Sequence, residues 1–291
     1  MKVVFFGTPE YVLPILKALY KEYNSGREQD LIAVVTQSPK EVGRKKFIER
    51  SPVDNWAYKH KIKVIHDLDN VPQTDLGIVA AYGKIIPQST ISKFSSGILN
   101  VHPSALPKYR GASPIQSAIL NGEGKIGVSV IKMDKEMDHG PIVSQFREEI
   151  GQDETNEEVR TKVFVRAAKF LIAMIPSYMS GEIRLKEQDH ASATFTNILG
   201  RDDGFVGLAA LNDAMKGKNS KKIYDLYRAM QPWPGAWSRI KVNNIEQRIK
   251  ILKMHMADDR KIVLDEVQLE SRNPVAWGEF KSAYPESELG A

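Results

Sequence analysis

Two polar side chains stand two positions apart at the end of a short apolar run, and their types suit acid–base chemistry. Residues 98–102 read Ile-Leu-Asn-Val-His, which places Asn100 and His102 at alternate positions. Alternate residues of a strand point to one face, so both side chains can reach one pocket. An amide can donate to a developing oxyanion, and an imidazole titrates near neutral pH. Asn100 and His102 are therefore candidate catalytic residues.

The residues after this pair predict a loop followed by a helix. Pro103 ends the strand pattern, because proline cannot donate a hydrogen bond to a central ladder. Pro107 and Gly111 mark the loop, and Ser113-Pro114 is typical of a helix start. Open α/β sheets keep their sites where strands end, which favours a site here. A lone histidine beside an apolar run is nevertheless more often structural than catalytic, so the rest of the chain must decide.

Short apolar runs alternate with helical patterns in the N-terminal part. This alternation predicts an α/β domain with a parallel sheet built from βαβ units. We expect strands at residues 2–6, 31–36, 63–65, 76–80, 98–102, 127–133 and 142–150. We expect helices that begin near Pro9, Pro52 and Pro114, and a long helix over residues 155–181 that is broken near Pro176. Residues 38–50 read as a basic loop.

The C-terminal part has a different pattern. Residues 182–208 are mixed and irregular, and an amphipathic helix around residues 223–230 follows them. Three short runs then predict a small β unit, at residues 239–242, 248–255 and 261–268. We interpret Trp233 and Trp237 as core residues. These patterns predict a catalytic domain over 1–184, a linker over 185–208 and a C-terminal domain over 209–291.

Composition excludes several classes of protein. The 291 residues include no cysteine, which excludes disulfides and cysteine-bound metals and fits a reducing cytoplasm. No apolar run is long enough to span a bilayer, and the first residues read as a strand rather than a signal peptide. The chain has no dinucleotide fingerprint, no P-loop motif and no paired-histidine spacing. We therefore expect a cytoplasmic protein without NAD, a metal or membrane association.

Basic residues gather in two places, although the net charge is only +5. The first group lies in one loop and comprises Lys40, Arg44, Lys45, Lys46 and Arg50. The second lies in the C-terminal part and comprises Lys216, Lys218, Lys221, Lys222, Arg228, Arg239, Lys241, Arg248, Lys250 and Lys253. Either group alone fits a solvated surface. Two groups in one chain shift the interpretation toward a nucleic-acid partner.

A polar, turn-rich segment over residues 133–142 adds two acids and a histidine, Asp134, Asp138 and His139. Aspartate and glycine favour turns for local reasons, so turn chemistry alone can explain the segment. The same side chains could also serve a site.

Several motifs together resemble the folate-dependent formyltransferase family, over nearly the whole chain. The most specific is Asn100-Val101-His102-Pro103-Ser104 with Leu106-Pro107 and Arg110-Gly111-Ala112. Met133-Asp134 with Met137-Asp138-His139-Gly140 resembles the aspartate loop of the family. The other matches are Phe6-Gly7-Thr8-Pro9-Glu10, Thr36-Gln37, Gly43-Arg44-Lys45-Lys46, Ser51-Pro52-Val53, Ala81-Tyr82-Gly83-Lys84-Ile85-Ile86-Pro87 and Gln231-Pro232-Trp233-Pro234-Gly235-Ala236-Trp237.

The resemblance implies a Rossmann-like formyltransferase domain with a parallel-rich sheet, followed by a smaller, OB-like and trimmed C-terminal domain. It implies formyl transfer from 10-formyltetrahydrofolate to the α-amino group of an initiator methionyl-tRNA by a monomer. Asn100, His102 and Asp138 would form the catalytic set. The implied folate-lining residues are Tyr82, Gly83, Ile85, Ile86, Pro87, Ser104, Ala105, Leu106 and Pro107. The implied tRNA contacts are Arg44, Lys45 and Lys46.

Three alternatives remain open. A formyltransferase acting on a nucleotide-linked amino sugar would share the catalytic set. The short chain after Arg248 favours it, whereas the basic loop and the segment Pro232-Trp233-Pro234-Gly235 argue against it. Glycinamide ribonucleotide formyltransferase is disfavoured, because that enzyme lacks a C-terminal domain. A catalytically silent RNA-binding module is disfavoured by the intact set. The sequence also departs from the family pattern, with His139 where Thr is common and Asn197 where Lys is usual.

Overall fold

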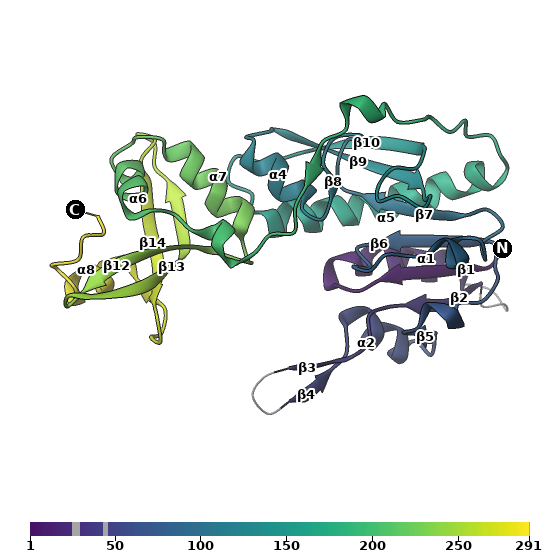
Figure 1. Ribbon diagram of the computed structural model, residues 1–291, viewed down its shortest axis with the longest axis horizontal. Helices are drawn as coiled ribbons and strands as arrows, with labels where there is room; N and C mark the ends of the chain where they lie inside the picture. The colour runs from purple at the N-terminus through teal and green to yellow at the C-terminus, as the bar shows by residue number, and fades with distance from the viewer. Residues whose placement is uncertain (25–29, 43–45, 291) are drawn as a thin grey trace. The chain divides into compact units, whose positions relative to one another are not determined.

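The computed structural model describes residues 1–24, 30–42 and 46–290 (Figure 1). Contacts divide the chain into two compact units. The first comprises residues 1–111, 126–148 and 160–195, and the second comprises residues 112–125, 149–159 and 196–291. The functional boundaries at residues 184 and 208 stay a prediction, because compactness groups segments by contact and not by role. Within the described ranges, no helix is long and apolar enough to cross a bilayer.

The first unit is built on a seven-stranded sheet in the order β10-β9-β7-β6-β1-β2-β5 (Figure 1). The strands are β1 Val3–Gly7, β2 Leu31–Val35, β5 Lys63–Ile65, β6 Leu76–Ala80, β7 Ile98–His102, β9 Lys125–Lys132 and β10 Ile142–Glu149. The neighbours from β7 to β5 pair in parallel, whereas β9 runs antiparallel to β7. The predicted parallel-rich α/β sheet is confirmed. Every residue of β1 and β6 is buried, as expected for parallel strands covered on both faces.

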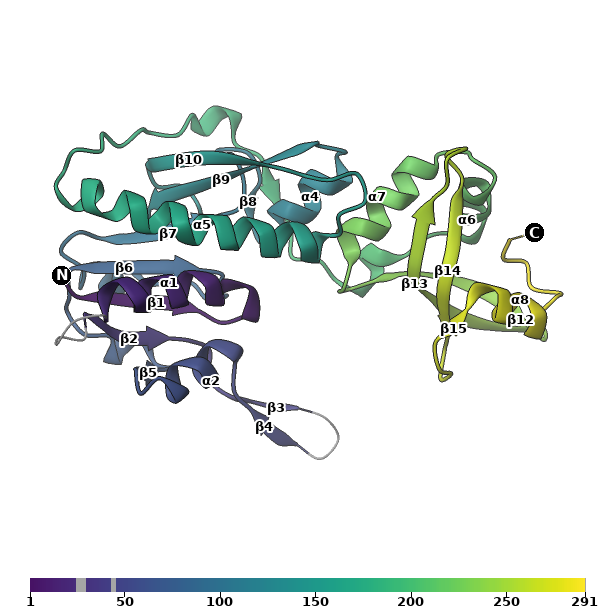
Figure 2. The same cartoon turned by 180° about the vertical axis from the view of Figure 1, so that it is seen from behind.

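Helices cover this sheet. They are α1 Leu13–Tyr23, α2 Pro52–Lys59, α3 Gln88–Ile91 and α5 Asn156–Met179, with 3-10 turns at Glu10–Val12, Leu68–Asn70 and His190–Ser192. Figure 2 shows α1 and α5 on the same face of the sheet, where the Tyr11 and Phe164 rings lie 5.2 Å apart.

The predicted break in the long helix is wrong, because α5 continues through Pro176 to Met179. Proline removes one backbone hydrogen bond and crowds the carbonyl four residues earlier. Here Pro176 lies in the last turn, where little helix remains to be lost. The buried face of α5 holds the helix in place and comprises Val159, Val163, Phe164, Ala167, Ala168, Leu171, Met174 and Ile175.

The prediction of a loop over residues 38–50 is also wrong in part. Strands β3 (Lys40–Val42) and β4 (Phe47–Glu49) pair antiparallel, with Lys40 opposite Glu49. The Thr36 hydroxyl hydrogen-bonds to the Ser51 hydroxyl at 2.8 Å and so closes the base of the segment. Ser51 is also the N-cap of α2 and accepts from the Asp54 N–H at 3.0 Å. Because both ends are fixed side by side, the two arms can run alongside each other as a hairpin.

The second unit contains a four-stranded antiparallel sheet in the order β12-β13-β14-β15. Its strands are β12 Ala236–Val242, β13 Ile245–Met256, β14 Ile262–Leu269 and β15 Val275–Ala276. Strands β8 (Arg110–Gly111) and β11 (Phe195–Thr196) form a separate two-stranded sheet. Its helices are α4 Pro114–Leu120, α6 Leu208–Met215, α7 Ser220–Met230 and α8 Trp277–Ala283, with a 3-10 turn at Arg201–Gly204. The predicted β-rich C-terminal part is confirmed. Trp237 is buried as predicted, but Trp233 lies in the turn before β12 and is 56% exposed, so its assignment to the core is wrong.

Arg228 of α7 is a structural residue rather than a surface charge. Its guanidinium contacts the Asp225 carboxylate at 2.6 Å and the carbonyls of Gly151 and Glu154 at 3.2 and 2.8 Å. The Arg228→Met variant is expected to lose about 3 kcal/mol of unfolding free energy, because these buried partners lose their cation. Denaturant unfolding measures this, with the exposed Lys222→Met as the matched control. Equal stability of the two variants would contradict the assignment.

Candidate active site

The structure brings Asn100, His102 and Asp138 together at the end of β7. The Asn100 amide donates from Nδ2 to Asp138 Oδ1 at 3.1 Å. His102 Nδ1 lies 3.5 Å from the same oxygen. The other carboxylate oxygen, Oδ2, accepts from the Gly111 N–H at 2.8 Å. The His102 and Asp138 side chains are 6% and 9% exposed, so water is largely excluded from the space between them.

The orientation of the His102 ring follows from its other nitrogen. Nε2 lies 2.9 Å from the Tyr109 carbonyl oxygen. A carbonyl can only accept, so Nε2 carries a proton. Nδ1 then faces Oδ1 of the Asp138 carboxylate. The ring is thus oriented by the hydrogen bond of Nε2, and its Nδ1 is left facing Asp138 at a distance that a small movement or a water molecule can bridge for proton exchange.

Asp138 has an unusual backbone conformation, with φ +53°. The left-handed region costs an L residue about 1 kcal/mol. Nearby, a Cβ on Gly140 would lie 1.9 Å from the Lys132 carbonyl oxygen, so the loop can pass β9 only with glycine there. This close approach turns the loop back over β7 and directs the Asp138 carboxylate toward Asn100 and His102.

The expected folate-lining residues lie on two adjacent loops. The loop with Tyr82, Gly83, Ile85, Ile86 and Pro87 follows β6, and the loop with Ser104, Ala105, Leu106 and Pro107 follows β7. Because β6 and β7 are parallel neighbours, both loops leave the same edge of the sheet. Their role as a folate site stays a prediction.

The first of these loops is fixed through its backbone. The Tyr82 carbonyl accepts from the Thr8 hydroxyl at 2.9 Å and from Gln37 Nε2 at 3.1 Å. The Tyr82 ring is buried, and burial raises the pKa of its phenol, so the hydroxyl stays protonated at neutral pH. Ile85, by contrast, is 87% exposed. A ligand would meet the Ile85 side chain and the loop backbone rather than the Tyr82 ring.

The second loop is held by β9 and β10. The Ser129 hydroxyl donates to the Ser104 carbonyl at 2.6 Å and accepts from the Leu106 N–H at 3.1 Å. The Ser104 hydroxyl itself donates to the Lys108 carbonyl at 2.6 Å. Ser104 and Leu106 are buried, so the loop is presented in one conformation.

Comparisons with known proteins bear on what this arrangement does. A family profile described as formyl transferase matches residues 1–175, and one described as formyl transferase, C-terminal domain, matches residues 217–264. The chain belongs to the formyl transferase family. A methionyl-tRNA formyltransferase of Sulfurihydrogenibium sp. is 33% identical over 263 residues, which cover 87% of this chain and 79% of that protein. One of Thermotoga maritima is 36% identical over 236 residues, covering 77% and 73%.

Solved structures of formyltransferases share the fold. A methionyl-tRNA formyltransferase from Clostridium thermocellum gives a TM-score of 0.59 at 20% identity, covering 92% of this chain and 98% of that one. An N-formyltransferase from Helicobacter canadensis, in complex with folinic acid and dTDP-3-aminofucose, gives 0.65 at 20% identity, covering 89% and 88%. The resemblance of the sequence to the formyltransferases is thereby confirmed, together with the mixed α/β fold.

The expected tRNA contacts of this formyltransferase are described only in part. Arg44 and Lys45 lie outside the described residues. Lys46 is exposed and lies 3.3 Å from Glu41. Lys40 and Arg50 are exposed on the same hairpin. A hollow of about 280 Å³ at its base lies beside the ends of β1 and β2 and is lined by Thr8, Pro9, Gln37, Ser38, Lys40, Glu49, Arg50, Ser51 and Pro52.

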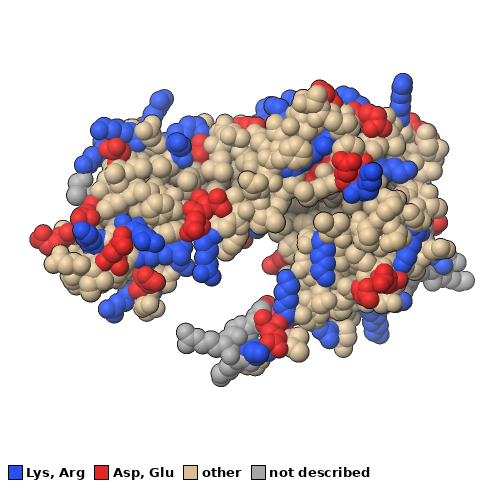
Figure 3. Space-filling model, viewed as in Figure 1, with Lys and Arg blue, Asp and Glu red and all other residues tan. Residues whose placement is uncertain are grey.

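Half of the second basic group is paired with acidic side chains. Figure 3 shows Lys and Arg side chains mixed with Asp and Glu over the second unit. The pairs are Lys218 with Asp213, Lys221 with Asp225, Arg228 with Asp225, Arg239 with Glu246, and Lys253 with Glu266. The group therefore provides a weaker positive surface than its sequence suggests.

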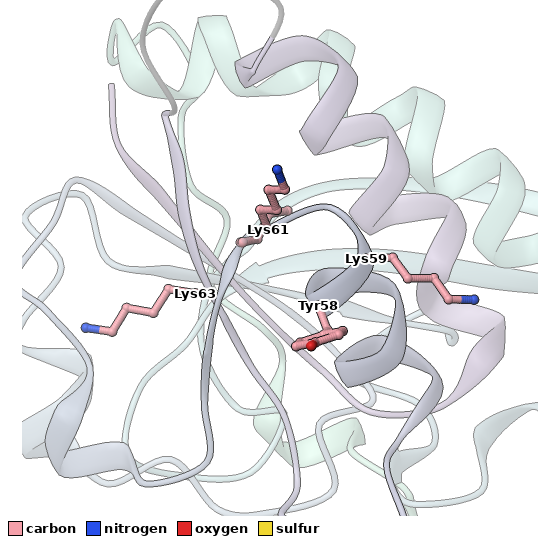
Figure 4. Close-up of a pocket in the computed structure, with 5 residues that line it drawn as sticks. Tyr58, Lys59, Lys61 and Lys63 are labelled. Atoms are coloured by element: carbon pink, nitrogen blue, oxygen red, sulfur yellow. The ribbon is translucent and has the colours of Figure 1, made fainter.

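Another hollow, of about 640 Å³, lies at the edge of the first unit's sheet and has lysines on its rim. It is lined by Tyr58, Lys59, Lys61, Ile62 and Lys63. Figure 4 shows that the three ammonium groups point in different directions, so they do not converge on one anion.

Sequence reasoning missed Gln188, which lies 5% exposed beside the active site. Its side chain bonds the backbone of the Asp138 loop and the guanidinium of Arg110. Residues 182–208 have no periodic sequence pattern, so the sequence gives no sign of this contact. Only the three-dimensional structure shows that Gln188 lies beside the Asp138 loop.

Proposed function

We propose that this chain transfers the formyl group of 10-formyltetrahydrofolate to the α-amino group of methionyl-tRNA. The observation that supports this most is the convergence of Asn100, His102 and Asp138, from segments 38 residues apart, at the edge of a formyltransferase sheet. The two relatives described above, which match 87% and 77% of the chain, are methionyl-tRNA formyltransferases.

The reaction begins with attack of the neutral amine on the formyl carbon. A free α-amino group has a pKa of about 8, so an appreciable fraction is neutral at cellular pH. Attack forms a C–N bond and moves the carbonyl electrons onto oxygen. Asn100 has a second Nδ2 hydrogen besides the one donated to Asp138, and it can donate to this oxyanion. One such donor is worth about 3 kcal/mol of transition-state stabilisation.

The tetrahedral intermediate then collapses as protons move. The ammonium formed by attack loses a proton to Asp138, directly or through water, and N10 of the folate gains one as its bond to the formyl carbon breaks. His102 favours this exchange, because its Nδ1 faces Asp138 and can hold the proton between the two steps. The loops after β6 and β7 hold the folate through their backbones.

The exposed cations Lys40, Lys46 and Arg50 of the basic hairpin contact the phosphates at the acceptor end of the tRNA. Phosphate contacts position a substrate without reading its sequence, so binding weakens steeply with salt. The cytoplasmic location and the monomeric state stay predictions.

Removing the described charges of the hairpin tests this role. The variant with Lys40, Lys46 and Arg50 replaced by alanine is expected to raise KM for tRNA about 10-fold and to flatten its salt dependence, because phosphate contacts are lost. The matched control replaces Lys59, Lys61 and Lys63 and removes the same charge from the edge of the sheet. Equal KM values for the two variants would show that net charge alone matters.

The deciding experiment supplies 10-formyltetrahydrofolate with either methionyl-tRNA or a nucleotide-linked amino sugar. We expect turnover with the tRNA and none with the sugar. Turnover with the sugar alone would overturn the proposed substrate while leaving the chemistry of the catalytic residues in place.

A further inference from the structure

We propose that Gln188 is a positioning residue for formyl transfer, which sets the place of Asp138 relative to His102 through Arg110. This inference rests on the proposed function. It concerns how the catalytic side chains are held and not which acceptor they serve.

The Gln188 amide is fully used in hydrogen bonding. Its Nε2 donates to the Asp138 carbonyl at 2.9 Å and to the Gly140 carbonyl at 2.8 Å. Its Oε1 accepts from Arg110 Nε at 3.2 Å and from Nη2 at 2.7 Å. Carbonyls only accept and a guanidinium only donates, so the amide fits in one orientation. Gln188 and Arg110 are 5% and 4% exposed, so water cannot replace these bonds easily.

The two hydrogen bonds donated by Gln188 Nε2 fix the Asp138 loop. The backbone of Asp138 is left-handed, with φ +53°, a conformation that an L residue adopts only at a cost in free energy. Gln188 bonds the carbonyls on both sides of His139 and so fixes the turn from which the Asp138 carboxylate projects. A small rotation of this turn would lengthen the contacts of the carboxylate to Asn100 and Gly111.

The two hydrogen bonds accepted by Gln188 Oε1 hold Arg110, which lies in the segment that faces the Asp138 carboxylate. The neighbours of Arg110 each bond a catalytic side chain. The Tyr109 carbonyl accepts from His102 Nε2, and the Gly111 N–H donates to Asp138 Oδ2. The Arg110 N–H is itself bonded to the Thr194 carbonyl at 2.8 Å. Gln188 therefore joins the two backbone segments that hold the imidazole and the carboxylate.

A stacked pair of histidines, His139 and His190, also connects the Asp138 loop to Arg110. Arg110 Nη2 lies 2.8 Å from His190 Nδ1, which must accept because arginine only donates. The His190 ring stacks on His139 with centroids 3.9 Å apart and planes 2° apart. His139 thus ties the Asp138 loop to Arg110 by a second route.

The Gln188→Glu variant tests the proposal, because it keeps the shape and the bonds to Arg110 but replaces the two donors with an oxygen that repels the carbonyls. We expect the single-turnover rate constant of formyl transfer to fall about 100-fold, because displacing reacting groups by about 1 Å lowers the rate by about this factor. The dissociation constant for methionyl-tRNA should change less than about two-fold, because Gln188 does not belong to the hairpin.

Single-turnover kinetics separate positioning from stability. A purely structural role would lower the amplitude, which counts folded enzyme, and leave the rate constant unchanged. That outcome would overturn the proposal. Because a buried carboxylate can destabilise the fold, Gln188→Asn is the second variant. It lacks one methylene and cannot span both partners, so its rate constant should also fall.

The matched control is Gln268→Glu, which makes the same exchange at a side chain that donates to the Arg272 carbonyl in the second unit. Its rate constant should equal that of the unaltered chain. The unaltered chain must form formyl-methionyl-tRNA in the same assay. If it does not, the proposed function fails, whereas normal rate constants in both Gln188 variants would refute the positioning role alone.

Discussion

The Asp138→Asn variant is expected to lower kcat about 1000-fold while leaving the affinity for methionyl-tRNA within about two-fold. The substitution is isosteric, so the loop can keep its path. Its amide group, however, must present hydrogens either to the Gly111 N–H or to the Asn100 amide, which both donate to the carboxylate in the unaltered chain. It also cannot take up the proton of the attacking amine.

The same substitution at Asp134 provides the control. Asp134 lies in the same loop and contacts His139 Nδ1 at 2.6 Å, but its side chain is 35% exposed and forms no hydrogen bond with Asn100, His102 or Asp138. Steady-state kinetics with saturating folate should find its kcat within about three-fold of normal. A similar loss in both variants would mean that loop charge, rather than proton transfer at Asp138, limits the reaction.

The His102→Ala variant is expected to abolish measurable turnover and to retain tRNA binding. The ring is the group that links the Tyr109 carbonyl to Asp138, and its loss removes the proton carrier beside the reacting nitrogen. We expect kcat to fall about 1000-fold or more, because both acid–base catalysis and the orientation of Asp138 depend on the His102 ring. Filter binding without folate measures tRNA affinity apart from chemistry.

His60→Ala is the matched control for this change. The His60 ring stacks on Trp56 at the end of α2, with centroids 3.8 Å apart, and is not part of the catalytic set. It should retain normal turnover. Turnover at near-normal rate in His102→Ala would falsify the mechanism, and loss of tRNA binding there would show that the imidazole shapes the substrate site instead.

Local chemistry determined much of this protein from the sequence alone. The apolar runs at residues 2–6 and 76–80 predicted strands that the structure places at residues 3–7 and 76–80, both buried, because a strand covered on both faces is made of apolar residues. Alternation placed Asn100 and His102 on one face, and Ser51-Pro52 marked a helix start. These signals depend on a few neighbouring residues, so the sequence displays them directly.

The tertiary structure decided what depends on distant partners. Pro176 did not end its helix, because the packed face of α5 outweighs one lost hydrogen bond. The basic segment became a hairpin, because Thr36 and Ser51 close its base. Arg228, which the sequence grouped with exposed basic residues, is buried and paired with Asp225.

The contact of Gln188 with Asp138 joins residues 50 positions apart. No sequence pattern predicts this contact, because hydrogen bonds between distant loops depend on three-dimensional placement and not on spacing along the chain. The residue types at the active site were thus determined by the sequence, while the geometry that allows them to exchange a proton exists only in the fold.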